Sequence, residues 1–243
     1  MKGYESYVQG TQQTPYVNLK GWRDNCLLMH PNWVHMFWDE TSARQLITEH
    51  YAWFLPTWNA YDREIARADV VRVFALHHYG GLYLDLDVQC FRNVRPFLRG
   101  YDVVLQGSTE EWDKGTINCA MASVPQHPLW LAYAQILPET QKQSSNFAAT
   151  GPAALARAVA SYYGTAEPIA PGTYKGPKGD ASVLKVYPVG EWYVPCMGNG
   201  SCNGELVKKL VIGDAFPKLA GYHRFQGTWY APPHEDAWVH TVT

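Results

Sequence analysis

The stretch from residue 64 to residue 87 constrains the fold of this chain more than any other. Apolar residues recur through it at helical spacing and predict a largely buried helix over Glu64–Tyr79, namely Ile65, Ala68, Val71, Ala75 and Leu76. Gly80-Gly81 ends this helix, because glycine tolerates the positive φ that helix C-termini often need. Leu82–Leu84 then predicts a short strand with Asp85-Leu86-Asp87 at its end. Together these features indicate an α/β unit.

The rest of the chain alternates between further helical and strand patterns. We expect helices over 19–29, 41–50 (with Thr41 or Ser42 as N-cap), 128–137 and 151–163, and strands over 33–38, 103–105, 117–122, 183–189 and 222–225. Residues 167–179, rich in proline and glycine, predict a long loop. The alternation indicates one α/β domain over residues 1–243 with a mainly parallel central sheet. Ligands of such sheets bind at the carboxyl ends of strands, where Asp85 and Asp87 fall.

Composition excludes several classes of protein. A hydrophobic content of 47% is too high for a disordered chain, and a formal net charge of -2 gives no basic excess for nucleic acid. No apolar run approaches the ~18 residues of a transmembrane helix. We expect a soluble, cytoplasmic chain, or one from the Golgi or ER lumen if the sequence is a truncated piece. The five scattered cysteines favour free thiols, although Cys196 and Cys202 could close a small loop.

The acidic pair suggests a metal site on charge alone. In an extended turn Asp85 and Asp87 point the same way, which is unfavourable unless a cation binds between them. Mg²⁺ and Mn²⁺ prefer such oxygen ligands and often keep a substrate phosphate in their shell. A solvated acidic turn is the alternative. Upstream, Asp69 and Arg72 share one helix face, as an ion pair would. Helix and strand could present all four side chains to one pocket.

These segments carry a resemblance. Residues 66–72 (ARADVVR) and 76–88 (LHHYGGLYLDLDV) resemble the signature of glycosyltransferase family 32, which includes alpha-1,6-mannosyltransferases and inositolphosphoceramide mannosyltransferases. Weaker matches are residues 22–38, Thr150-Gly151-Pro152 and residues 223–229 (HRFQGTW), with Thr228 where the family usually has serine. The family's apolar first strand has no convincing counterpart in Met1–Pro15. The resemblance implies a GT-A fold, a Rossmann-like α/β domain that binds a nucleotide sugar.

The resemblance also implies residue roles in metal binding. Asp87 is expected to be a direct metal ligand, for Mn²⁺ or Mg²⁺. Asp85 is expected to contact the metal through water, or the hydroxyls of the ribose or donor sugar. His223 either completes the metal shell with a neutral imidazole nitrogen or is a structural histidine.

For the donor, the resemblance implies four residues. Asp69 accepts hydrogen bonds from donor-sugar hydroxyls, and Arg72 faces the sugar or the diphosphate. Tyr83 packs near the donor or belongs to the core. Trp229 closes over the diphosphate or simply packs.

The implied activity is metal-dependent, retaining transfer of a hexose from a nucleotide sugar to a glycan or glycolipid hydroxyl. Mannose from GDP-mannose is the first expectation, with UDP-sugars as alternatives. A non-catalytic glycan- or nucleotide-sugar-binding domain would share the motifs. A haloacid-dehalogenase-type phosphotransferase also uses Asp-x-Asp with Mg²⁺, but its nucleophile is usually followed by Asp-Gly-Thr, whereas Val88-Gln89 follows here.

Overall fold

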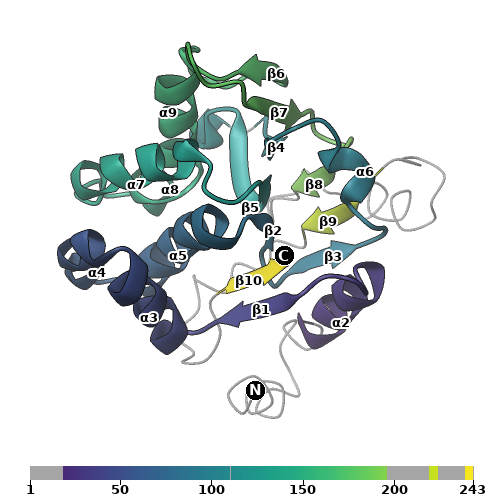
Figure 1. Cartoon of the computed structure of the whole chain (residues 1–243), viewed down its shortest axis with the longest axis horizontal. Helices are drawn as coiled ribbons and strands as arrows, with labels where there is room; N and C mark the ends of the chain where they lie inside the picture. The colour runs from purple at the N-terminus through teal and green to yellow at the C-terminus, as the bar shows by residue number, and fades with distance from the viewer. Residues whose placement is uncertain (1–18, 110, 196–218, 224–238, 243) are drawn as a thin grey trace.

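A mixed sheet forms the middle of the computed structural model, which describes residues 19–109, 111–195, 219–223 and 239–242 (Figure 1). Its seven strands lie in the order β1-β10-β2-β5-β4-β7-β6. Their bounds are β1 (His35–Trp38), β10 (Val239–Val242), β2 (Gly81–Leu84), β5 (Thr116–Ser123), β4 (Val103–Gly107), β7 (Val183–Tyr187) and β6 (Gly172–Lys175).

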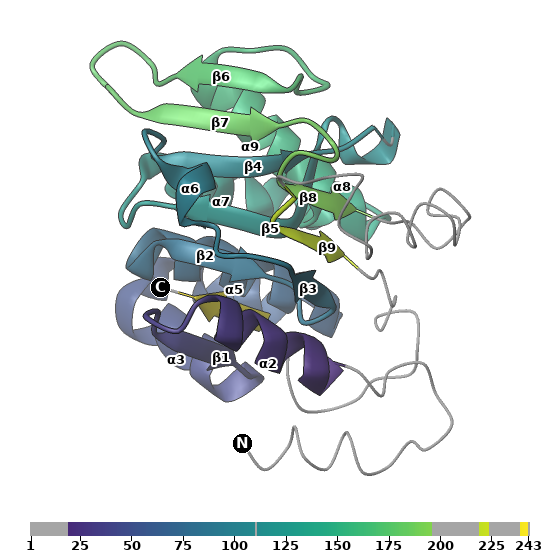
Figure 2. The same cartoon turned by 90° about the vertical axis from the view of Figure 1, so that its right-hand side faces the viewer.

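Helices cover one face of this sheet and a smaller layer covers the other (Figures 1 and 2). The first layer consists of α3 (Glu40–His50), η2 (Ala52–Phe54), α4 (Leu55–Ala60), α5 (Glu64–Tyr79), α7 (Pro128–Thr140), α8 (Asn146–Ala149) and α9 (Pro152–Tyr163). The second contains α2 (Leu19–Met29), α6 (Arg95–Leu98) and a three-stranded sheet of β3 (Val88–Cys90), β9 (Gly221–His223) and β8 (Tyr193–Pro195). Each face therefore has its own apolar core.

The expected mainly parallel sheet is wrong. Among the described neighbouring strands of the large sheet, β4 and β7 run parallel and the other pairs run antiparallel. Helices do separate β1 from β2 and β5 from β6, as the alternation predicted. However, β4 and β5 are joined by a short segment around η3 (Glu111–Asp113), and β10 inserts between β1 and β2. The expected crossover helices are thus missing from part of the chain.

The predicted helix over Glu64–Tyr79 is confirmed as α5, which has the same bounds. Residues on all its sides are buried, because it packs between the sheet, α3 and α7. Gly80 ends it with a φ of 66°. A Cβ at Gly80 would lie 2.5 Å from the backbone nitrogen of Pro125, so glycine is required by both backbone conformation and space. The chain then enters β2 directly.

On the opposite face, Cys26 of α2 forms a disulfide with Cys90 of β3. The expectation of free thiols is therefore wrong for this pair, while Cys119 is a buried free thiol. The two partners lie 64 residues apart, and only the packing of α2 on β3 brings them together. Cys196 and Cys202 lie outside the described residues.

Two local predictions also differ from the structure. Asp39, and not Thr41 or Ser42, caps α3: its carboxylate accepts a hydrogen bond from the backbone nitrogen of Ser42, whose side chain completes a capping box. Strand β6 lies within the expected loop over residues 167–179, because pairing with β7 organises residues whose composition favours turns.

None of the described helices combines the length and the apolar character needed to cross a membrane. The cellular compartment stays a prediction.

Candidate functional site

The acidic turn lies where β2 ends. The backbone nitrogen of Asp85 donates to the carbonyl of Cys119 on β5 (2.9 Å), and that of Val88 donates to the carbonyl of Asp85 (3.0 Å). The chain therefore turns tightly from the large sheet into β3. Val88 pairs with His223 in the small sheet, so this register brings the end of β9 next to Asp87.

Three side chains with metal-ligating atoms meet at this turn. One ligand atom from each of Asp85, Asp87 and His223 lies within 4.8 Å of the other two. The Nε2 atom of His223 is 3.1 Å from Oδ1 of Asp87 and 3.7 Å from Oδ2 of Asp85. Two carboxylates and an imidazole suit Mn²⁺, and the carboxylates also suit Mg²⁺, so the residues present fit the expected cation.

His223 is an internal partner of the acidic pair. It is buried, and burial acts to lower the pKa of its imidazole, but the Asp87 carboxylate outweighs this and holds the pKa well above its usual range. Without a bound cation His223 is therefore protonated and supplies the positive charge between the carboxylates. A divalent cation would displace that proton and use the neutral nitrogen as ligand.

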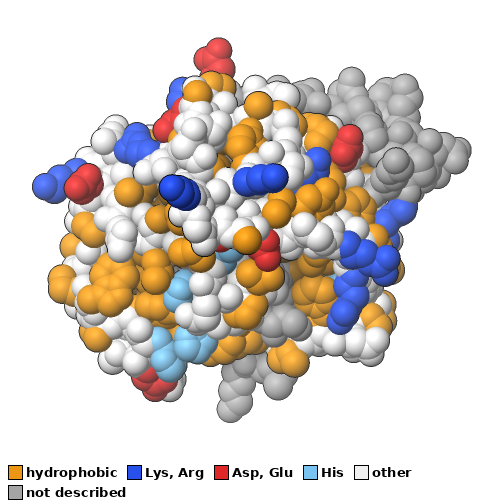
Figure 3. All heavy atoms as spheres, turned by 45° about the horizontal axis from the view of Figure 1, so that its top comes forward, with side chains coloured by type: hydrophobic (Ala, Val, Ile, Leu, Met, Phe, Trp, Pro, Cys, Tyr) orange, Lys and Arg blue, Asp and Glu red, His pale blue; other side chains and the backbone are white. Residues whose placement is uncertain are grey.

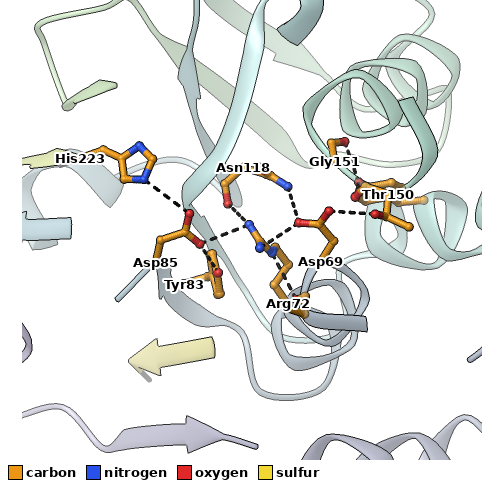
Figure 4. Close-up of polar contacts among 10 residues, drawn as sticks. Asp69, Arg72, Tyr83, Asp85, Asn118, Thr150, Gly151 and His223 are labelled. Carbon is orange, nitrogen blue, oxygen red and sulfur yellow. Dashed lines mark hydrogen bonds and ion pairs between the residues drawn. The ribbon is translucent and has the colours of Figure 1, made fainter. Parts of the chain in front are cut away.

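A continuous set of polar contacts extends from this turn into the helical layer (Figure 4). Arg72 of α5 lies between two carboxylates: its Nη2 is 2.8 Å from Oδ1 of Asp69, and its Nη1 is 3.3 Å from Oδ1 of Asp85. Asp69 and Arg72 are each 5% exposed. The structure thus brings the four predicted residues, Asp69, Arg72, Asp85 and Asp87, to one end of the sheet.

Tyr83 supports this arrangement from within the core. Its side chain is fully buried, its hydroxyl donates to Oδ1 of Asp85, and its ring lies 4.7 Å from the guanidinium carbon of Arg72. Contact of Tyr83 with a donor stays a prediction. Trp229 lies outside the described residues.

Asn118 has a part in the site that the sequence analysis did not detect. Its side-chain nitrogen donates to Oδ1 of Asp69 (3.1 Å), and its backbone carbonyl accepts from Nη1 of Arg72 (2.8 Å). Asn118 lies where the pairing of β4 with β5 shifts from Leu105–Met121 to Gln106–Ile117. Such irregularities in a strand redirect side chains next to active sites. Nothing in the local sequence signalled this one.

Thr150 holds the other oxygen of Asp69. Its hydroxyl donates to Oδ2 of Asp69 (2.8 Å), and its own carbonyl accepts from the hydroxyl of Tyr133 (2.7 Å). Thr150 is fully buried. The Thr150-Gly151-Pro152 match had flagged this segment, but without a role.

Burial raises the pKa of Asp69 to about 6, against the opposing effects of Arg72 and of the hydrogen bonds from Thr150 and Asn118. Asp69 is therefore ionised at neutral pH. Three of the roughly four lone-pair positions of its carboxylate are occupied by these partners, which leaves one position on Oδ2 for a ligand hydroxyl.

Comparison with known proteins agrees with this site. Residues 17–105 match the family model described as "Glycosyltransferase sugar-binding region containing DXD motif". That segment contains Asp69, Arg72, Tyr83, Asp85 and Asp87, but neither Asn118 nor His223.

Several curated relatives are fungal. A mannosyl phosphorylinositol ceramide synthase of Saccharomyces cerevisiae is 36% identical over 132 residues, which cover 54% of this chain and 34% of that protein. Inositol phosphoceramide mannosyltransferase 2 of Schizosaccharomyces pombe is 37% identical over 123 residues, covering 51% of this chain and 34% of the relative. The match thus spans about a third of the length of these relatives.

A solved structure titled "PaToxG Glycosyltransferase" resembles the fold distantly, with a TM-score of 0.39 and 14% identity over 50% of this chain and 45% of that one. This chain therefore contains a segment, residues 17–105, that matches the DXD-containing sugar-binding region of glycosyltransferases, and about half of the chain is similar to the fungal proteins named above.

Proposed function

We propose that this chain is a metal-dependent, retaining hexosyltransferase that moves mannose from GDP-mannose to a hydroxyl of a glycolipid or glycan. The observation that carries the proposal is the meeting of Asp85, Asp87 and His223 beside the buried Asp69–Arg72 pair. The relatives' names support mannose as the sugar and a phosphorylated ceramide lipid as the acceptor. UDP-sugars and glycan acceptors are the alternatives.

The metal role is assigned to the turn after β2. Asp87 is the proposed direct ligand, with His223 as a second ligand and Asp85 binding directly or through water. A bound Mn²⁺ or Mg²⁺ would act as a Lewis acid that stabilises the charge on the departing nucleoside diphosphate. Because Tyr83 and Arg72 both hold Oδ1 of Asp85, its Oδ2, which faces His223, is the oxygen better placed for the metal.

The sugar role is assigned to Asp69. Its remaining lone-pair position on Oδ2 can accept a hydrogen bond from a donor-sugar hydroxyl, and its burial makes such a bond strong. Arg72, Asn118 and Thr150 hold the carboxylate in one orientation. A preorganised acceptor of this kind adds to transition-state binding because it need not reorganise during the reaction.

Retention by same-face attack of the acceptor hydroxyl is the proposed stereochemical course. It needs no nucleophilic carboxylate on the far side of the sugar. In this scheme the chain's residues position donor and acceptor, and the leaving diphosphate accepts charge next to Asp87 and His223.

A donor screen tests the proposal. Purified protein with Mn²⁺ is mixed separately with GDP-mannose, UDP-glucose, UDP-galactose and UDP-N-acetylglucosamine, and released nucleoside diphosphate is measured. We expect metal-dependent turnover with one donor, abolished by Asp87→Asn and Asp87→Ala. Glu49→Ala is the matched control, because this exposed carboxylate lies on α3 outside the site.

Each contrary result has a distinct meaning. No turnover or binding with any donor, or an unchanged rate in Asp87→Ala, would refute the proposal. Metal-independent nucleotide-sugar binding without turnover would indicate a binding domain. Hydrolysis of p-nitrophenyl phosphate would indicate a phosphotransferase.

A further inference from the structure

Three arginines on the face opposite the helical layer have no acidic partner. Arg92, Arg95 and Arg99 are exposed, and the segment from residue 88 to residue 101 contains no aspartate or glutamate. Among the described residues none of the three forms an ion pair. They therefore place three uncompensated positive charges on and around the short helix α6.

Two other exposed arginines, Arg44 and Arg63, have polar partners in the helical layer, as does the partly buried Arg67. Arg67 pairs with Glu40 (3.1 Å), Arg44 donates to Asn59 (2.7 Å) and Arg63 donates to Asn146 (3.0 Å). The chain as a whole carries a net charge of -2. The positive charge around α6 is thus a local feature and not a consequence of overall composition.

Apolar side chains on the neighbouring segment, residues 28–34, are also exposed. Leu28, near the end of α2, is 75% exposed and Val34 is 67% exposed. The guanidinium of Arg95 lies 5.3 Å from the centre of the Trp33 ring, which connects the two groups. Figure 3 shows Lys and Arg side chains gathered next to hydrophobic ones on the right-hand side of the molecule, where α2 and α6 lie in Figure 1.

The two segments are fixed to each other. The side-chain nitrogen of Asn93 donates to the carbonyl of Met29 (2.9 Å), and the backbone nitrogen of Val94 donates to Nε2 of His30 (3.2 Å). The Cys26–Cys90 disulfide ties α2 to β3 just before this contact. The segments that carry the charged and the apolar groups are therefore held in a fixed position relative to each other.

We propose that this α2–α6 face, defined by Leu28, Val34, Arg92, Arg95 and Arg99, docks onto the surface of an anionic phospholipid bilayer. The guanidinium group pairs with phosphate and carboxylate oxygens of lipid headgroups, and exposed aliphatic side chains enter the boundary between headgroups and acyl chains. Anionic leaflets attract clustered basic residues in this way.

Charge complementarity and the aliphatic residues together favour a lipid surface over a nucleic acid. Single-stranded nucleic acids are bound by basic grooves with aromatic side chains on which bases stack. Here the ring of Trp33 is covered by Arg95, and the most exposed apolar groups are the aliphatic Leu28 and Val34.

Vesicle binding tests this surface without any need for glycosyltransfer. The whole chain is mixed with vesicles of phosphatidylcholine alone or with about 30% phosphatidylserine, and bound protein is measured by sedimentation. We expect binding to the anionic vesicles that weakens as salt is raised. The triple variant Arg92→Gln/Arg95→Gln/Arg99→Gln should lower the partition coefficient about a hundredfold, and Leu28→Ser about fivefold.

Matched controls and the donor assay separate the possible outcomes. Arg44→Gln and Arg63→Gln remove exposed charges from the helical layer and should leave vesicle binding unchanged. The triple variant should keep its thermal midpoint and its donor turnover in solution, so failure of the docking surface and failure of the proposed activity are distinguishable. Equal binding to both vesicle types, full binding by the triple variant, or arginine-dependent binding to single-stranded RNA without vesicle binding would overturn the inference.

Discussion

Thr150→Val removes one hydroxyl from a fully buried position and nearly preserves the shape of the side chain. In the native protein that hydroxyl donates to Oδ2 of Asp69 at 2.8 Å. Valine leaves this carboxylate oxygen without its protein donor on a residue that is only 5% exposed. The variant therefore isolates the contribution of one hydrogen bond to the ionised form of Asp69.

The loss of stability caused by removing this hydrogen bond depends on whether Asp69 is ionised. A hydrogen bond to an ionised group contributes roughly 2 kcal/mol to stability, whereas one to a neutral group contributes roughly 1 kcal/mol. The pKa of Asp69 is about 6 in the folded chain, compared with 3.8 for an ordinary aspartate. We expect Thr150→Val to lower the free energy of unfolding by about 2 kcal/mol at pH 8 and by about 1 kcal/mol at pH 5.

The sign follows from proton linkage. Because the folded-state pKa of Asp69 exceeds its unfolded-state value, the folded chain binds more protons between pH 3.8 and about pH 6, and the free energy of unfolding falls as pH rises through that range. Loss of the Thr150 hydroxyl raises the folded-state pKa further. The free energy of unfolding therefore falls more between pH 5 and pH 8 in Thr150→Val than in the natural chain.

Urea unfolding followed by tryptophan fluorescence, with EDTA present, measures both variants at pH 5 and pH 8. Thr150→Ser is the control, because it keeps the hydroxyl and loses only a methyl group. Its destabilisation should be the same at the two pH values. A Thr150→Val penalty that is equal at both values, or larger at pH 5, would contradict the proposed contact with ionised Asp69.

Two further predictions concern His223 and the disulfide. His223→Ala should raise the Mn²⁺ concentration needed for half-maximal donor turnover at least about tenfold, because its Nε2 atom lies 3.1 Å from Oδ1 of Asp87. The control is His50→Ala, which changes an exposed histidine. An unchanged Mn²⁺ requirement in His223→Ala would exclude His223 as a ligand. Cys26→Ser/Cys90→Ser should lower the free energy of unfolding by about 4 kcal/mol, the chain-entropy value for a loop of 64 residues. Calorimetry of the natural chain and the double variant measures this difference. A loss below about 1 kcal/mol would contradict the loop-entropy explanation.

Sequence predicted the part of the site that is local along the chain. The helical spacing over Glu64–Tyr79, the glycine at position 80 and the strand before Asp85 each act within one or two turns of backbone, so the pattern alone predicted α5 and β2. Asp69 and Arg72 share a helix face for the same local reason.

The missed features depend on contacts between distant segments. An apolar run over Thr116–Ser123 fits a regular strand as well as an irregular one, and pairing with β4 decides where Asn118 points. In the same way, the insertion of β10 and the pairing of Cys26 with Cys90 require neighbours that periodicity does not encode. Asn118, which contacts both Asp69 and Arg72, is the site residue that the sequence pattern most clearly failed to predict.

The contacts of Arg72 change how its predicted role is best understood. Its guanidinium contacts Asp69, Asp85, the carbonyl of Asn118 and, more weakly, the carbonyl of Ala68 at 3.4 Å. Four of its five N–H donors are therefore used within the protein, and the side chain is 5% exposed. We infer that Arg72 acts mainly as an internal counter-ion.

This assignment has an electrostatic consequence for the acidic turn. With His223 protonated, the three carboxylates exceed the two cationic side chains by one negative charge. On the proposed metal role, a divalent cation in place of the imidazole proton would make the cluster neutral before a donor binds. Since Arg72 is already shared between Asp69 and Asp85, the cation proposed to bind at Asp87 would supply most of the positive charge that balances a donor diphosphate. Asp87→Asn should therefore weaken binding of the diphosphate more than binding of the nucleoside alone.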